Sequence, residues 1–256
     1  GAGSGRRQDR SRCVCPKTLP PSGAAMGQAM GLSPSGPQHM PILSYGAITQ
    51  EGSRNMSVSG SSPPHAGATA ALPALSLIIP VFQGWHDLPV LLGALEAQSF
   101  QDFEILIADN EPSPYPDHAF QALVPVGLAG RVLHVHCARP GSYAARNAAA
   151  AQARAPRLVF TDADCHPLPG WLAALMAAAD RHPAALLAGP IRRTLCADPG
   201  MWEIYDALRG IPQARYVAHG YATTANLSVP HPLFKALSGF DPRRLSGGDA
   251  EFCRRA

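Results

Sequence analysis

The chain has 256 residues, of which 46% are hydrophobic and 15% are charged, so it can bury a core as one large domain or two small ones. No apolar run approaches the ~20 residues that a membrane-spanning helix requires. Residues 1–73 carry a net charge of +4 and the remainder carries −1, so the part that can fold lacks the basic surface that nucleic-acid binding requires.

Residues 1–73 differ in composition from the rest of the chain. Glycine, proline and serine supply 31 of these 73 residues, and no periodic apolar pattern is present. Such a segment buries too little surface to offset its conformational entropy, so we expect a disordered, low-complexity tail followed by one domain over residues 74–256. The six cysteines form neither a disulfide framework nor a metal motif, which predicts reduced thiols in a cytoplasmic protein.

From residue 74 on, short apolar strands alternate with helices. The pattern predicts strands over residues 75–81, 103–108, 131–137, 157–161 and 184–188. It predicts helices over 87–98, 142–154 (capped by Ser142), 172–181, 199–209 and 232–237, with an irregular connection over 210–228. A last helix begins at residue 248, and we expect the chain to end inside it. The alternation indicates an α/β fold with a parallel sheet covered on both faces.

Polar residues stand at the ends of these strands, where open α/β sheets bind ligands. Asp109 follows the second strand, and Asp162 and Asp164 follow the fourth. No glycine-rich dinucleotide or phosphate-binding motif is present, which argues against those two classes of nucleotide site. Two alternating carboxylates can bind a hard cation such as Mg²⁺ or Mn²⁺, although an aspartate-rich turn is the simpler alternative.

Six short motifs follow one another in the part that can fold. They are LIIPVF at 77–82, EILIADN at 104–110, ARN at 145–147, FTDAD at 160–164, TANLS at 224–228 with GFD at 239–241, and GDAEFCRR at 248–255. In this order they resemble the family-two inverting glycosyltransferases with the glycosyltransferase-A fold. The resemblance implies a Rossmann-like, mixed but mainly parallel sheet, with the domain truncated at its C-terminus.

The resemblance also implies an activity. The enzyme would transfer a sugar from a nucleotide sugar, expected to be UDP-linked, to an acceptor hydroxyl with inversion, and would depend on Mg²⁺ or Mn²⁺. The acceptor would be a glycan, a lipid-linked molecule or a small molecule. Bacterial cell-envelope polysaccharide synthesis is the expected setting, in the cytoplasm or at the inner face of the membrane.

The same resemblance assigns residue roles. Asp249 would be the general base, Asp109 would bind the nucleobase, and Asp164 would bind the metal ion. Asp162 would bind the ribose or the donor sugar, and Arg146 would support the acids or phosphates. The other donor-binding positions would be Pro80, Val81, Phe82 and Ala163.

The motifs depart from the family pattern at the last helix. Gly248 stands where an acid is frequent, and Glu251 stands where Asp is frequent. Two alternatives to a glycosyltransferase remain open at this point: a catalytically silent relative that binds a glycan or partner, and a nucleotidyltransferase. The nucleotidyltransferase would need a basic, glycine-rich phosphate loop after its first strand, and residues 82–85 do not supply one.

Overall fold

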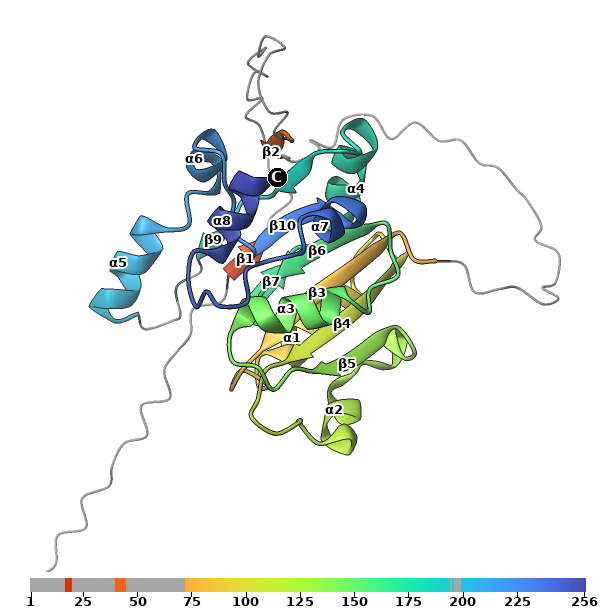
Figure 1. Ribbon diagram of the computed structural model, residues 1–256. Helices are drawn as coiled ribbons and strands as arrows, with labels where there is room; N and C mark the ends of the chain where they lie inside the picture. Colours follow the sequence, from red (N-terminus) through yellow and green to blue (C-terminus); the bar gives the residue numbers. More distant parts are fainter. Residues whose placement is uncertain (1–16, 20–39, 45–71, 194, 196–198) are drawn as a thin grey trace, which may run out of the picture.

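The computed structural model describes residues 17–19, 40–44, 72–193, 195 and 199–256. Its main sheet has seven strands in the order β2-β8-β10-β6-β3-β4-β5 (Figure 1). Four strands run parallel at its centre and one side: β6 (Arg157–Thr161), β3 (Leu75–Val81), β4 (Phe103–Asp109) and β5 (Val132–His136). The mixed, mainly parallel sheet of the sequence-based prediction is therefore confirmed.

On the other side of the sheet, one of the described strands runs opposite to the rest. β10 (Asn226–Pro230) pairs antiparallel with both β6 and β8 (Leu186–Ala188), and β2 (Ile42–Ser44) adds in parallel to the edge of β8. A second, small sheet joins β7 (Cys165–Pro167), β1 (Lys17–Leu19) and β9 (Arg192–Arg193). Two short strands, β1 and β2, lie within the expected tail of residues 1–73, most of which lies outside the described residues, and its disorder stays a prediction.

Two hydrophobic cores cover the two faces of the main sheet. Alternation along β3 sends Leu77 and Ile79 into one core and Ile78 into the other. The first core also contains α1 (Leu88–Glu96), α2 (Asp117–Leu123), a 3₁₀ turn at Val126–Leu128 and α4 (Trp171–Arg181). The second contains α3 (Ser142–Ala150), α7 (His231–Ala236) and α8 (Gly248–Arg255).

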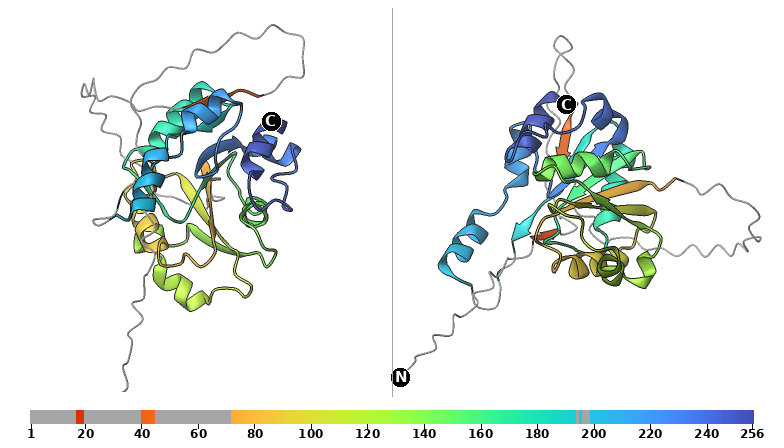
Figure 2. Two further views of the ribbon diagram at one scale, coloured as in Figure 1. Left: turned by 90° about the vertical axis from the view of Figure 1, so that its left-hand side faces the viewer. Right: turned by 60° about the horizontal axis from the view of Figure 1, so that its bottom comes forward.

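Two further helices, α5 (Met201–Arg209) and α6 (Gln213–Ala218), lie to one side of the sheet in Figures 1 and 2. The expected irregular connection over residues 210–228 is therefore wrong, because it contains α6 and the start of β10. Ser142 is also not a capping residue: α3 begins after Gly141, whose φ of 115° suits glycine, and the Ser142 side chain makes no capping bond. Among the described residues, none of the helices has the length and apolarity needed to cross a membrane.

Candidate active site

The turn after β6 carries the pair of alternating aspartates. The carboxylate oxygens of Asp162 and Asp164 and the sulfur of Cys165 all lie within 4.8 Å of one another. Ala163, between the two aspartates, packs into the first core and so anchors the turn. The two carboxylates offer the oxygen ligands that Mg²⁺ and Mn²⁺ prefer. The Cys165 thiol is buried and directs its S–H toward the carbonyl of Ala225, so the oxygen pair is the part that fits a hard cation.

Helix α3 positions the first of these aspartates. The guanidinium of Arg146 donates to Oδ1 of Asp162 at 2.6 Å, with the Arg146 side chain only 5% exposed and that of Asp162 25% exposed. The neighbouring Asn147 exchanges two hydrogen bonds with the backbone of Phe240, so the segment before α8 is held to the same helix. Two of the three residues of the ARN motif therefore join α3 to other parts of the site.

Asp249 lies in the first turn of α8 and is reached by three donors. Its Oδ1 accepts the N–H of Ala250 at 2.9 Å and the hydroxyl of Tyr143 at 3.2 Å. Its Oδ2 accepts the N–H of Thr224 at 3.4 Å. These three hydrogen bonds fix the orientation of the carboxylate at the start of α8. The Thr224 hydrogen bond joins the TANLS motif to Asp249.

One turn of α3 thus serves two parts of the site. Tyr143 and Arg146 are three residues apart, so they stand on one face of the helix. Tyr143 contacts Asp249, Arg146 contacts Asp162, and the Arg146 guanidinium carbon lies 5.7 Å from the centre of the Tyr143 ring. The structure therefore links the aspartate pair to Asp249 through one helix. Sequence reasoning missed Tyr143, whose only signal was this spacing from Arg146.

Asp109 lies at the end of β4 as expected, but its carboxylate is fully buried. Oδ1 accepts the N–H of Glu111, while Oδ2 accepts the N–H of Tyr115 and lies 3.0 Å from Nε2 of His134. Every one of these partners belongs to the protein, so in this structure Asp109 shapes the loop after β4. Its contact with a nucleobase stays a prediction.

The end of β3 presents an aromatic edge. Val81 is buried and Pro80 is partly buried, whereas the Phe82 ring is 57% exposed. Next to it, Oε1 of Glu111 accepts the N–H of Gln83 at 2.6 Å and the indole N–H of Trp85 at 3.2 Å.

The Trp85 indole is stacked on the Tyr115 ring, with the ring centres 3.9 Å apart. Trp85, Tyr115 and Glu111 were not among the predicted donor-binding residues. They border the same strand ends as Phe82, and none of them belongs to a motif that the sequence analysis singled out.

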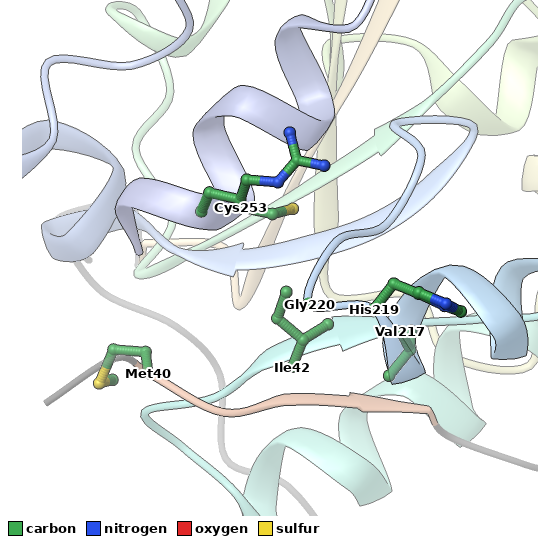
Figure 3. Close-up of a pocket in the computed structure, with 7 residues that line it drawn as sticks. Met40, Ile42, Val217, His219, Gly220 and Cys253 are labelled. Atoms are coloured by element: carbon green, nitrogen blue, oxygen red, sulfur yellow. The ribbon is translucent and has the colours of Figure 1, made fainter.

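A surface pocket of about 420 Å³ lies beside α8, one helical turn beyond Asp249 (Figure 3). The residues that line it come from β2 and the segment before it, from α6 and the turn after it, and from α8. They are Met40, Ile42, Val217, His219, Gly220, Cys253 and Arg254. Burial and the nearby negative charge of Asp249 raise the pKa of the Cys253 thiol to about 12. Cys253 is therefore protonated at neutral pH and is a poor nucleophile.

The comparisons with known proteins agree with this architecture. The model of the family described as "Glycosyl transferase family 2" matches residues 76–236, which is more than half of the chain. The chain belongs to glycosyl transferase family 2. Asp249 lies beyond the matched residues, so its role is not part of this assignment.

Among curated proteins, Glycosyltransferase AglE of Haloferax volcanii is 26% identical over 191 residues, covering 73% of this chain and 62% of that protein. The crystal structure of S. aureus TarS 1-349 in complex with UDP-GlcNAc superposes with a TM-score of 0.56 at 20% identity, over 71% of this chain and 52% of that chain. Mannosyltransferase PcManGT from Pyrobaculum calidifontis, in complex with GDP-Man and Mn²⁺, gives 0.50 at 18% identity, over 70% and 50%. The glycosyltransferase-A fold is thereby shown, while the chain spans only about half to two thirds of these relatives.

Proposed function

We propose that the protein transfers a sugar from a nucleoside-diphosphate sugar to an acceptor hydroxyl, with inversion at the anomeric carbon. The observation that carries this proposal is that α3 connects the Asp162–Asp164 turn and Asp249 through Arg146 and Tyr143. A UDP-linked donor is supported by the likeness to TarS, which was solved with UDP and with UDP-GlcNAc. The family assignment argues against the nucleotidyltransferase alternative.

The reaction follows from what each group can do. In a single displacement, Asp249 takes the proton of the acceptor hydroxyl as that oxygen bonds to the anomeric carbon. The bond from the anomeric carbon to the diphosphate breaks, and its electron pair leaves with the nucleoside diphosphate. One base is sufficient, and attack from the face opposite the leaving group inverts the anomeric centre.

Asp162 and Asp164 would hold a divalent cation, with Asp164 as the principal ligand and Asp162 held in place by Arg146. When bound, the cation neutralises charge that grows on the leaving diphosphate. Mn²⁺ in the PcManGT structure supports this choice of cofactor. Arg146 fixes the rotamer of Asp162 and supplies a positive charge to the same part of the site.

Three classes of acceptor are compatible with this reaction: a glycan, a lipid-linked molecule or a small molecule. The reduced state of the cysteines stays a prediction. The cytoplasmic or inner-membrane location, the bacterial origin and the cell-envelope role stay predictions.

Calorimetric titration with UDP and with GDP, in Mn²⁺ and in EDTA, tests the donor site. We expect tighter binding in Mn²⁺, and we expect Asp164→Ala to remove the difference while the circular-dichroism spectrum is unchanged. The exposed Asp102, changed to Asn, is a matched control that should retain the difference. Equal affinity of the parent protein in Mn²⁺ and in EDTA would show that the aspartate pair forms a turn and binds no metal ion. A catalytically silent relative that binds a glycan or partner would then be the better interpretation.

A further inference from the structure

We propose that Tyr143 is a positioning residue for Asp249, and that residue 248 is glycine because the Tyr143 ring lies against it. This inference rests on the proposed function, in which Asp249 is the general base. It concerns two residues to which the family resemblance gives no role.

The hydrogen bonds to Asp249 are distributed unequally between its two oxygens. Oδ1 accepts two donors, the Tyr143 hydroxyl at 3.2 Å and the Ala250 N–H at 2.9 Å. Within the part of the chain that the structure describes, Oδ2 has only the longer contact from the Thr224 N–H, at 3.4 Å. Tyr143 therefore helps to fix the plane of the carboxylate and leaves Oδ2 as the oxygen more available for a proton.

The position of the Tyr143 ring depends on the absence of a side chain at residue 248. A Cβ atom built on Gly248 would lie 2.6 Å from Cε2 and 2.8 Å from Cδ2 of Tyr143, closer than carbon atoms approach without displacement. Tyr143 is itself buried, and its ring packs against Phe240 with the ring centres 5.4 Å apart. The acid that is frequent at this position of the motif therefore has no space here, and the Tyr143 ring occupies the space beside Gly248.

The surrounding charges keep the tyrosine a donor. Burial raises the pKa of Tyr143, and the negative charge of Asp249 raises it further, while Arg146 acts in the opposite direction. On α8, the Cys253 thiol also faces Asp249, and it stays neutral because its own pKa is about 12. At neutral pH Tyr143 is thus a neutral phenol that can only donate to the ionised carboxylate.

Loss of the Tyr143 hydroxyl has a specific consequence for catalysis. The Tyr143 hydroxyl helps to hold the plane of the carboxylate that takes the proton, so Tyr143→Phe leaves that plane less well fixed. We expect kcat to fall while the KM for the donor is unchanged, because the phenol contacts the base and not the aspartate pair.

Two measurements on the full chain test this inference. In ¹³Cζ-tyrosine NMR, the resonance missing from Tyr143→Phe identifies Tyr143, and we expect it to titrate at lower pH in Asp249→Asn than in the parent. Tyr216, stacked on Tyr221, supplies the control variant Tyr216→Phe, which should leave the Tyr143 titration unchanged. An unaltered Tyr143 titration in Asp249→Asn would overturn the contact.

The kinetics of sugar transfer are the second measurement. A fall in kcat with an unchanged donor KM in Tyr143→Phe but not in Tyr216→Phe supports the positioning role. An unchanged kcat, or a donor KM that rises as kcat falls, refutes it. If the parent transfers no sugar, the proposed function fails, whereas the NMR titration still decides whether Tyr143 and Asp249 are coupled.

Discussion

The ion pair between Arg146 and Asp162 should contribute measurably to the stability of the fold. Arg146→Met keeps an unbranched side chain of similar length but removes the guanidinium that donates to Asp162 at 2.6 Å. A hydrogen bond to a charged group contributes about 1.5–3 kcal/mol, and breaking a buried ion pair costs about 3–5 kcal/mol. Because the Asp162 side chain is 25% exposed, water offsets part of this loss, and we expect about 2 kcal/mol.

For a domain of this size, a loss of about 2 kcal/mol corresponds to a fall in melting temperature of about 4–8 °C. Thermal unfolding followed by circular dichroism measures it. Arg243→Met is the matched control, because the Arg243 side chain is 82% exposed where it pairs with Asp241, and exposed pairs contribute little. A melting temperature of Arg146→Met equal to that of the control would refute the assignment of Arg146 as the anchor of the aspartate turn.

Three further predictions concern packing, pH and the tail. Gly248→Ala should lower the free energy of unfolding of the parent by about 1–3 kcal/mol, because its Cβ would meet the Tyr143 ring. The same change made in the Tyr143→Ala variant should cost far less. Losses that add in the double variant, measured by denaturant unfolding, would contradict the steric argument. Burial raises the pKa of Glu104, but the hydrogen bonds from Ser76 and Arg154 together lower it by more than burial raises it. The pKa of Glu104 therefore lies below its ordinary value of 4.5. The stability it contributes is therefore present above pH 4.5 and lost as the pH falls, and a Glu104→Gln deficit independent of pH would refute this. Deleting residues 1–44 should lower the melting temperature more than deleting 1–39, because only the former removes β2 from β8; equal values would show that this pairing contributes nothing.

The strands were the easiest elements to predict from the sequence. β3 and β6 have the predicted bounds because continuous apolar runs between turn residues are typical of strands buried on both faces. β10 was missed because its sequence NLSVP contains two polar residues, and only its pairing with β6 and β8 buries them. α2 was missed because Phe120 is the one residue that it buries.

The candidate site was predictable in its residues but not in its contacts. The motifs placed Asp162 and Asp164 directly after β6, Arg146 inside α3 and Asp249 in the first turn of α8, while the roles of these residues stay predictions. Their partners depend on segments far apart in the chain, such as the contact between Tyr143 and Asp249 across 106 residues. The inward orientation of Asp109 likewise depends on His134 of the neighbouring strand, which no local pattern reveals.

Sugar transfer by Asp249→Asn tests the central claim most directly. The assay follows release of nucleoside diphosphate from a panel of nucleotide sugars with Mn²⁺ and candidate acceptors, alongside donor binding by calorimetry. Asparagine keeps the size of the side chain but cannot take the proton, so we expect donor binding to be retained and transfer to fall by about 10²-fold or more. Glu251→Gln, on the same helix and paired with Arg255, should retain transfer. Transfer by Asp249→Asn at the parent rate would contradict the assignment of Asp249 as the general base.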